Sequence, residues 1–470
     1  MSRKKIGDEK LYKELVSLLG PRKVSNKLVD LISYSHDYWP ISLLWFLKGE
    51  IPSLPSIVVF PESLRDVVKV VRYAYDNEIP LYAYGGGTGV LGGAVPEYGG
   101  IVIDLKRLRH IKLYEEDLYV DVGAGTNGMI LENYLNKKGY TLGHFPQSLY
   151  SSTVGGWIST KAIGQFSTKY GGIEDMLLGL EVVVPPGEVI HIKPNPRAAV
   201  GPDIKHLFIE AEGMFGIITR AYLKIHPYPE KRVLLSFASK SLADALESVQ
   251  NILRRGAKPA VVRIYDKVET LKWFHMKKKA KGKIGTIIIL EGDNVLVEAE
   301  RKIVEEEFRN AEPMGEEPVR YWLEKRFDVR ELPEYAPLGI VIDTIEVAVP
   351  WSRAVDLYND VINAMRDIEG TLIAYAHASH FYPQGVCFYF IFGGIPPKGI
   401  SATEYYEKIW EAAMNATLKH EGAISHHHGI GRMRAKWIRK DLGDATMELL
   451  RKMKNAIDEK RILNRGNMGV

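Results

Sequence analysis

The chain has 470 residues, which is enough for two or three domains with ample hydrophobic cores. Its formal net charge is only +4, and no dense basic face argues for nucleic-acid binding. The single cysteine, Cys387, excludes an internal disulfide and a cysteine-based metal knuckle, and its apolar neighbours predict a buried small side chain. The polar, Lys-rich start does not resemble a secretory signal, so we expect a cytoplasmic protein.

The predicted elements begin with a mostly helical stretch over residues 8–50. Residues 39–47 form its longest apolar run, which contains Pro40 and is too short to span a bilayer. This run is either core or an apolar lip that touches a membrane or a lipid. A strand over 56–60, an amphipathic helix over 62–77 with Ser63 as its N-cap, and a strand over 79–84 follow.

Short strands separated by glycine-rich turns and helices come next, at residues 101–105, 118–122, 181–184 and 217–225. The composition changes at Tyr228-Pro229. Residues 231–395 then predict a second unit of helices and strands, with an opening strand, a helix at 241–255, and strands at 260–264, 284–290, 342–349 and 386–392. Residues 401–460 are expected to be largely helical.

The most informative motif is the glycine-rich loop that follows the strand at 79–84. Gly85, Gly86, Gly87 and Gly89 lack Cβ atoms, so the backbone can approach a diphosphate with several N–H groups pointing at it. Gly87, Gly89 and Gly92 also match the G-x-G-x-x-G pattern of nicotinamide-dinucleotide folds, but that motif must open a helix and no helix fits here. A glycine-rich turn without a ligand is the other alternative for this loop alone.

Two further patches of small residues lie in the same region. The second covers Pro146–Thr160, whose hydroxyls and glycines can bind phosphate and ribose oxygens, and the third covers Glu212–Thr219. Each patch alone could be structural. Three of them within one αβ region predict a single long cofactor that passes between them.

Together these patches resemble the FAD-binding domain of the vanillyl-alcohol-oxidase (PCMH-type) flavoproteins. The matching stretches are Gly85–Thr88, Ser152–Thr160 and Glu212–Thr219. Within that superfamily nearly the whole chain is similar to the alkyldihydroxyacetonephosphate synthases, and more distantly to FAD-linked D-lactate and glycolate dehydrogenases. The stretches that carry the closer resemblance are Thr141–Ser148, Ser152–Thr160, Gly201–Asp203, Pro259–Arg263, Cys387–Phe390 and Ser425–Gly431.

The resemblance implies an α+β fold. It consists of a two-subdomain PCMH-type FAD-binding domain, an αβ cap domain for the substrate, and helical N- and C-terminal segments. The expected boundaries are 1–50 for the N-terminal segment, 51–228 for the FAD-binding domain, 229–400 for the cap, and 401–470 for a C-terminal segment that completes the active site.

The resemblance also implies FAD as cofactor. Residues 83–93 contain no histidine that could tether the flavin, so we expect noncovalent binding. The diphosphate and flavin side would contact Ala83, Tyr84, Gly85, Gly86, Gly87, Thr88, Gly89, Pro146, Gln147, Ser148, Ser152, Thr153, Gly155 and Gly156. The ribose and adenine side would contact Thr160, Lys161, Ala162, Ile163, Glu212, Gly213, Gly216, Ile217 and Ile218.

The resemblance implies that Tyr389 is the catalytic tyrosine, which removes a carbon-bound proton. The local sequence alone would instead predict a tyrosine buried in the core, on a strand of aromatic residues. The other expected catalytic residues are His144, Arg263, and the run His426, His427 and His428. The arginine that binds phosphate falls near Arg330 or Arg326. We expect no metal. The alternative is a metal site in which His377 and His380 join the histidine run as ligands.

The implied function is exchange of the acyl chain of acyl-dihydroxyacetone phosphate for a fatty alcohol through an adduct at flavin N5. Because Phe145 and Gln147 replace acidic residues and Ile391 replaces a second tyrosine, the substrate does not follow from the family alone. The alternatives are an FAD-linked 2-hydroxyacid dehydrogenase and a flavin-binding protein without turnover. We expect a small phosphate-bearing or lipid-like substrate, no nucleic acid, no transmembrane segment, possible peripheral membrane contact, and a homodimer.

Overall fold

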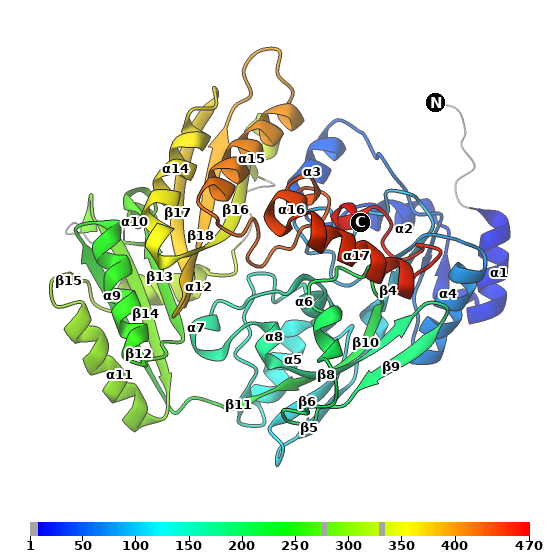
Figure 1. Ribbon diagram of the computed structural model, residues 1–470, viewed down its shortest axis with the longest axis horizontal. Coiled ribbons are helices and arrows are strands. Elements are labelled where there is room, and N and C mark those ends of the chain that lie inside the picture. Colours follow the sequence, from blue (N-terminus) through cyan, green and yellow to red (C-terminus); the bar gives the residue numbers. More distant parts are fainter. Residues whose placement is uncertain (1–7, 275–279, 329–333) are drawn as a thin grey trace.

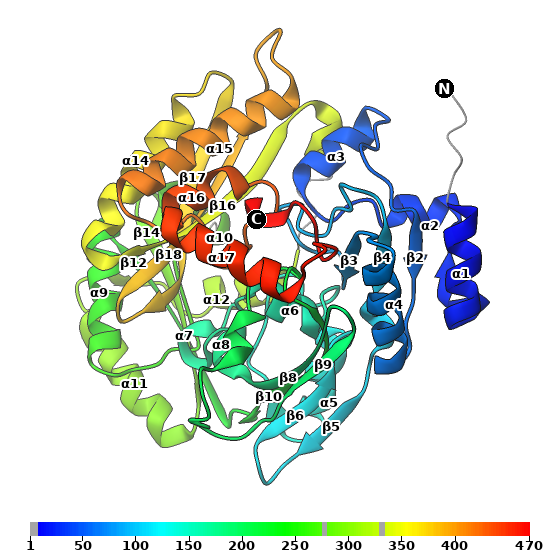
Figure 2. The same ribbon diagram turned by 45° about the vertical axis from the view of Figure 1, so that its right-hand side comes forward.

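The computed structural model describes residues 8–274, 280–328 and 334–470, and three β-sheets organise this part of the chain (Figure 1). Two sheets of the N-terminal half lie on one side of the molecule, and the large sheet of residues 231–394 lies on the other. The C-terminal helices α16 (Ala435–Leu442) and α17 (Asp444–Ile457) lie between these two parts in both views (Figures 1 and 2).

The first sheet has the order β1-β2-β4-β3, and β2, β4 and β3 are parallel. Its strands are β1 (Val24–Ser25), β2 (Ile57–Val59), β3 (Leu81–Tyr84) and β4 (Ile101–Asp104), and its helices are α1 (Glu9–Leu19), α2 (Leu28–Ser33), α3 (Pro40–Leu47) and α4 (Leu64–Asp76). The predicted cap of α4 is confirmed, because the Ser63 side chain accepts a hydrogen bond from the Asp66 N–H at 3.2 Å. The N-terminal segment also supplies β1, which pairs with β2 and so joins this sheet.

The second sheet is antiparallel, with the order β5-β6-β10-β8-β9. Its strands are β5 (Ile111–Tyr114), β6 (Tyr119–Gly123), β8 (Leu177–Val184), β9 (Glu188–Ile192) and β10 (Ile217–Lys224); β7 (Tyr140–Thr141) and β11 (His226–Pro227) form a separate pair. The helices of this region are α5 (Gly128–Asn136), α6 (Val154–Thr160), α7 (Ser167–Tyr170) and α8 (Ile173–Met176). No helix occurs between Gly87 and β4 in these described residues, so the nicotinamide alternative for the first glycine loop lacks its required helix.

The third sheet is antiparallel and has the order β15-β12-β14-β13-β17-β18-β16. Its strands are β12 (Lys231–Ser239), β13 (Val261–Tyr265), β14 (Ile284–Gly292), β15 (Glu312–Pro313), β16 (Val341–Pro350), β17 (Thr371–Tyr382) and β18 (Gly385–Gly394). The helices are α9 (Leu242–Arg254), α10 (Lys267–Trp273), α11 (Asn294–Glu307), α12 (Glu317–Lys325), α14 (Ala354–Arg366) and α15 (Ala402–Lys419). The sequence pattern did not predict β17, α11 or α14.

The register of this sheet places polar residues in rows on one face. Tyr389 of β18 lies opposite Glu346 of β16 and opposite His377 of β17, which in turn lies opposite Tyr265 of β13. Residues that are directly opposite across a ladder project from the same face of a sheet. The fold therefore gathers Glu346, Tyr389 and His377 from three different strands.

The chain end returns to the first sheet. The Leu81 N–H donates to the Ile462 carbonyl at 2.7 Å, and the Asn464 N–H donates to the Leu81 carbonyl at 2.9 Å. The C-terminal residues thus link β3 to α16 and α17, and α16 packs against α15. β3 is the strand that precedes the first glycine loop. Among the described helices, none is long and apolar enough to cross a membrane.

Candidate functional site

The first and second glycine patches pack directly against each other. A Cβ atom on Gly85 would overlap Thr153 Oγ1, and one on Gly86 would overlap the Ser151 carbonyl oxygen. Gly87 has a φ of +65°, and a side chain there would also overlap the Tyr84 ring. Glycine at these positions therefore allows two loops from different sheets to come within backbone contact.

The same junction offers unpaired hydrogen-bonding groups. In the described ranges, the N–H groups from Gly85 to Gly89 donate to no backbone acceptor, and these residues are partly exposed. Thr153 Oγ1 is buried and has no hydrogen-bond partner among the described residues. Successive free N–H groups and a free hydroxyl are the donors that a diphosphate requires, so the residues present fit the diphosphate of FAD.

Other residues of the predicted cofactor set have structural partners. The Gly155 N–H donates to the Ala124 carbonyl at 2.8 Å, and a Cβ on Gly216 would overlap Val182. Thr160 Oγ1 donates to the Gly156 carbonyl at 3.0 Å within α6. Lys161 ends α6 in the left-handed conformation, with a φ of +51°. The other predicted residues lie before α6 (Pro146, Gln147, Ser148 and Ser152), after it (Ala162 and Ile163), in the turn before β10 (Gly213), at the start of β10 (Ile217 and Ile218) and within β3 (Ala83).

Glu212 of the third patch points at the C-terminal part of the chain. Its Oε1 accepts the N–H groups of Ile430 at 2.7 Å and Gly431 at 3.0 Å, and its Oε2 accepts the Asn467 side-chain amide at 2.7 Å. Burial raises the pKa of this carboxyl. The carboxylate of Glu212 therefore anchors the loop that follows the histidine run.

The histidine run lies in a loop, Ser425–Gly431, which we call the histidine loop. Glu346 of β16 accepts the N–H groups of His426 at 3.2 Å, His427 at 3.0 Å and His428 at 2.7 Å on one oxygen, Oε1. Its other oxygen accepts a hydrogen bond from Arg434. Neither Glu346 nor Arg434 was predicted as a site residue, because no sequence spacing relates them to the loop.

The rings of the histidine loop join those on β17 and β18. The Tyr389 ring stacks on His377 with a centroid distance of 5.0 Å and meets His428 edge-on at 5.5 Å. The His427 ring lies 5.1 Å from His380, and Tyr382 Oη hydrogen-bonds with His426 Nε2 at 2.9 Å. The rings of the three adjacent histidines thus face three different neighbours.

Burial keeps these groups uncharged. It lowers the pKa of His426 to about 4 and lowers the pKa values of His427 and His428, while the Glu346 carboxylate opposes the lowering. Burial also raises the pKa of Tyr389, whose hydroxyl accepts a hydrogen bond from Thr344 Oγ1 at 3.0 Å. In this structure Tyr389 is therefore a neutral phenol.

Two arginines flank Trp322 beside this cluster. The Arg263 guanidinium lies 5.5 Å from the Trp322 ring centroid, and the Arg326 guanidinium lies 5.7 Å from it. Arg263 donates to His377 Nε2, and Arg326 donates to the side chain of Gln165 at 3.0 Å. In the described part of the chain neither arginine has an ion pair with a carboxylate; Arg330 lies outside the described residues.

His144, the remaining predicted catalytic residue, is buried against Trp157 of α6 with a ring centroid distance of 4.6 Å. Among the described residues neither of its ring nitrogens has a hydrogen-bond partner, and burial lowers its pKa to about 3. It is a neutral histidine beneath the second patch, and no described contact joins its ring to the histidine loop.

Among the residues that the structure describes, one group of side chains could hold a metal ion. Donor atoms of Cys387, His426 and His427 all lie within 4.8 Å of one another. Cys387 is fully buried, as the sequence predicted, and it lies two residues before Tyr389 on β18. Neither the sequence spacing nor the predicted pair His377 and His380 identified this combination.

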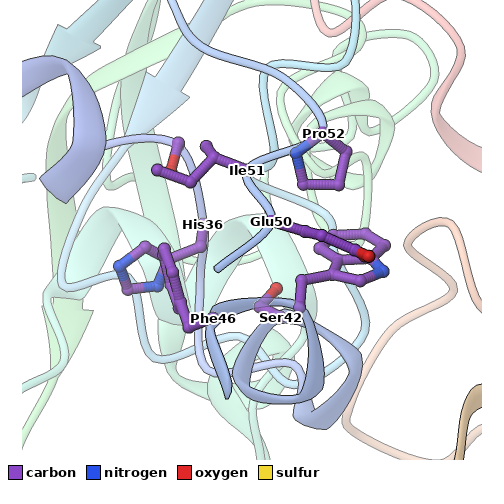
Figure 3. Close-up of a pocket in the computed structure, with 8 residues that line it drawn as sticks. His36, Ser42, Phe46, Glu50, Ile51 and Pro52 are labelled. Carbon is purple, nitrogen blue, oxygen red and sulfur yellow. The ribbon is translucent and has the colours of Figure 1, made fainter. Parts of the chain in front are cut away.

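A separate small pocket lies beside α3 (Figure 3). Its walls come from α3 and the segments on either side, including His36, Ser42, Phe46 and Ile51. The apolar run 39–47 supplies several of these walls, while Leu47 remains exposed. The pocket holds none of the predicted catalytic residues.

The comparisons with known proteins agree with this arrangement. A family described as "FAD binding domain" matches residues 55–193, and one described as "FAD linked oxidases, C-terminal domain" matches residues 228–468. Alkyldihydroxyacetonephosphate synthase of Caenorhabditis elegans is 28% identical, over 97% of this chain and 83% of that protein. The mitochondrial D-lactate dehydrogenase (cytochrome) 1 of Saccharomyces cerevisiae is 25% identical, over 97% of this chain and 79% of that protein.

Solved structures confirm the predicted α+β fold. An alkyldihydroxyacetonephosphate synthase structure matches with a TM-score of 0.83 and 25% identity, covering 98% of this chain and 87% of that chain. The fold is also that of p-cresol methylhydroxylase, with a TM-score of 0.75 at 17% identity over 98% of this chain and 96% of that chain. Because the match to the C-terminal domain of FAD-linked oxidases spans more than half of the chain, the protein belongs to this family and is an FAD-dependent enzyme.

Proposed function

We propose that the protein is a transferase of the alkyldihydroxyacetonephosphate synthase type. It would exchange the acyl chain of acyl-dihydroxyacetone phosphate for a fatty alcohol. The observation that carries the proposal is the pair Arg263 and Arg326, which both contact the Trp322 ring and have no carboxylate ion pair among the described residues. Arg263 also donates to His377, whose ring stacks on Tyr389. The similarity to the synthases over nearly the whole chain supports the same choice.

Two arginines without a direct carboxylate ion pair are suited to a phosphate. A buried cation is costly unless an anion neutralises it, and burial already lowers the pKa of Arg326 to about 10. A phosphate monoester carries nearly two charges and offers three acceptor oxygens, which two guanidinium groups can share. A hydroxyacid carboxylate carries a single charge and would leave part of this positive charge unmatched.

Arg263 also connects the proposed phosphate site to the proposed proton-transfer site. Its guanidinium donates to His377 Nε2, so the His377 Nδ1 proton points to Glu269, whose Oε2 lies 2.8 Å away. The His377 ring in turn stacks on Tyr389. A phosphate held by Arg263 would thus place the adjacent carbon of the substrate near Tyr389 and His428.

Two groups can accept the proton from that carbon. Tyr389 is the acceptor that the resemblance implies, but its raised pKa means that its own proton must first move to a neighbour. His428 is neutral, its Nδ1 lacks a hydrogen-bond partner among the described residues, and it lies 3.7 Å from Glu346 Oε2, which stabilises the protonated ring. We propose that His428 takes up the proton that Tyr389 releases.

FAD, when bound to Gly85–Gly89 and Thr153, would supply the electron-accepting ring on which the exchange depends. The chain's own contribution is to bind the phosphate, orient the carbon and move its proton. The bond from carbon to the acyl oxygen breaks, a bond from the same carbon to the alcohol oxygen forms, and no net oxidation takes place.

Turnover of palmitoyl-dihydroxyacetone phosphate with hexadecanol tests this function, with release of palmitate as the readout. Arg263→Ala and Arg326→Ala should each raise KM by about 10- to 100-fold, which corresponds to loss of a charge-assisted hydrogen bond. Arg255→Ala is the matched control, because Arg255 pairs with Glu306 and Glu307 and lies away from Trp322. No palmitate release by the FAD-loaded wild type, or an equal rise in KM for the control, would contradict the proposal.

A second candidate function is an FAD-linked 2-hydroxyacid dehydrogenase. The observation in its favour is the donor group of Cys387, His426 and His427, which could hold a metal ion that binds a hydroxyacid. This enzyme would bleach its flavin on anaerobic addition of D-lactate or glycolate, whereas the transferase would not. Metal analysis of the purified protein gives an independent second readout.

A further inference from the structure

The histidine loop wraps around a single carboxylate. Three successive N–H groups, those of His426, His427 and His428, point at Glu346 Oε1, and the Ser425 hydroxyl donates to the same oxygen at 3.2 Å. Successive N–H groups that converge on one point form a concave anion-binding turn. Here the anion is the carboxylate of Glu346, which belongs to β16 of the third sheet.

Arg434 completes this arrangement by binding both oxygens of Glu346. It donates to Oε1 at 3.1 Å and to Oε2, and also to the Glu346 carbonyl at 2.9 Å and the Gly429 carbonyl at 3.0 Å. The side chains of Glu346 and Arg434 are both 0% exposed. The guanidinium therefore keeps the carboxylate ionised in a place where water cannot solvate it.

We propose that Glu346 is a positioning residue that fixes the directions of the three histidine rings. Because three adjacent N–H groups are fixed toward one oxygen, their side chains must fan out in different directions. The rings do so: His426 contacts Tyr382, His427 faces His380, and His428 meets Tyr389. The effect of this positioning on turnover rests on the proposed function, whereas the effect on the loop itself does not.

The other end of the loop is held from the FAD-binding side. Glu212 accepts the Ile430 and Gly431 N–H groups, and a Cβ on Gly431 would overlap the Leu91 carbonyl beside the first glycine loop. Glu346 thus holds the first part of the histidine loop from β16, and Glu212 holds its last residues. Loss of Glu346 should loosen residues 425–428 and leave residues 430–431 in place.

The test compares Glu346→Gln with Asp458→Asn in the full-length, FAD-loaded protein. Asp458 is a matched control, because it is a fully buried carboxylate that accepts the Ile462 and Leu463 N–H groups and pairs with Lys454, away from the histidines. Both variants leave a buried cation unpaired, so both should lower thermal stability. Only Glu346→Gln should raise amide hydrogen exchange in residues 425–428, by about 10-fold or more, since charged acceptors of this kind contribute about 1.5–3 kcal/mol.

Two further readouts separate positioning from general destabilisation. Diethyl pyrocarbonate should modify His426–His428 faster in Glu346→Gln than in the wild type or in Asp458→Asn, as measured by peptide mass spectrometry. With palmitoyl-dihydroxyacetone phosphate and hexadecanol, kcat should fall at least 10-fold in Glu346→Gln with KM within threefold. Asp458→Asn should keep kcat within threefold of the wild type.

Unchanged exchange in residues 425–428, unchanged modification of the histidines, or an equal fall of kcat in Asp458→Asn would overturn the proposal. If the wild type shows no turnover, the proposed function fails, while exchange and histidine modification still decide the positioning role. If Glu346→Gln does not fold, the double variant Glu346→Leu with Arg434→Met replaces the buried ion pair by an apolar pair and is measured in the same way. Native-like exchange of residues 425–428 in that variant would equally overturn the proposal.

Discussion

At the residue scale, Tyr389 lies between two histidine rings, stacked on His377 and edge-on to His428. Burial determines the protonation of all three groups, since it lowers the pKa values of both histidines and raises that of the tyrosine. A proton can therefore pass from Tyr389 to a neutral histidine only when a ligand changes the local charge. The Arg263 guanidinium, which hydrogen-bonds with His377, favours an anion at the same place.

Tyr389→Phe tests this arrangement by removing one oxygen while leaving the aromatic packing. If Tyr389 handles the proton, turnover should fall by about two to four orders of magnitude, with FAD content unchanged. The unfolding free energy should change by only about 1 kcal/mol, because a single hydrogen bond, from Thr344, is lost. Tyr358→Phe, which removes a hydrogen bond to Asp266 in the same region of the cap, is the control and should keep its turnover.

The opposite result for Tyr389→Phe has a defined meaning. Full turnover in Tyr389→Phe together with an inactive His428→Gln would assign the proton transfer to His428 alone. That outcome would favour the hydroxyacid dehydrogenase over the transferase.

Asp343, next to Thr344 on β16, provides a pH-dependent prediction. Burial raises its pKa to about 7, so the folded state favours the protonated carboxyl, which Tyr406 contacts at 2.7 Å. Its contribution to stability is fully present below about pH 4 and is lost as the pH rises through about 7. Relative to Asp343→Asn, the wild type should therefore lose unfolding free energy between pH 5 and 7, at up to about 1.4 kcal/mol per pH unit.

Chemical denaturation at pH 5, 6, 7 and 8 measures this difference. Asp121→Asn is the control with the opposite sign, because hydrogen bonds from Arg220 and His110 lower the pKa of Asp121 in spite of its burial. Its difference from the wild type should stay constant over this range. A constant difference for Asp343→Asn would show that Asp343 is already ionised at pH 5.

At the element scale, the decisive feature is the contact between the loop after β3 and the loop before α6. Gly85 and Gly86 lie so close to Ser151 and Thr153 that no side chain fits between the two loops. The distance between the loops fixes the positions of the free N–H groups at Gly85–Gly89. Cofactor binding therefore depends on the spacing of two elements as well as on the composition of one motif.

Gly86→Ala should separate these loops, because its Cβ would meet the rigid Ser151 backbone. We expect FAD occupancy to fall at least 10-fold, measured from the absorbance ratio at 450 and 280 nm. Gly139→Ala, outside the predicted cofactor set, is the control for general strain, since its φ is +82° but its Cβ would meet nothing within 4 Å. Equal FAD occupancy in both variants would show that the loop spacing does not govern binding.

At the scale of the whole molecule, the C-terminal segment connects the two halves. Residues after α17 contact β3, Glu212 binds the end of the histidine loop, and α15 packs on α14 and β16 of the cap. Figure 2 shows α16 and α17 lying between the first sheet and the cap sheet. The site is consequently built from all parts of the chain, and its halves are not expected to work separately.

The mode of FAD attachment is a prediction about the intact protein. No histidine occurs in residues 83–93, so acid or heat denaturation should release the flavin into the supernatant. Flavin fluorescence that stays with the precipitated chain would show a covalent bond elsewhere. The expected homodimer and cytoplasmic location also stay predictions, and light scattering should give twice the chain mass of 53.0 kDa.

The local sequence was sufficient to predict the elements whose signals are local. Ser63 with its apolar helix and the glycine loop after β3 each depend on neighbouring residues, and the structure agrees with them. The match of three glycine patches to a flavoprotein family likewise predicted the fold and FAD. The strand β17 was missed because its alanines and histidines, from Ala374 to His380, give no clear strand pattern.

The arrangement of the site was decided by tertiary structure alone. Glu346 accepts the N–H groups of residues that are 80 to 82 positions away, and Arg434 neutralises it from 88 positions away. The Trp322 ring contacts both Arg263 of β13 and Arg326, which directly follows α12. Sequence spacing could not decide between Arg326 and Arg330 as the arginine that binds phosphate. Motifs report short-range backbone geometry, whereas buried charge must be neutralised by whichever residue the fold brings near, and only the packed structure identifies that residue.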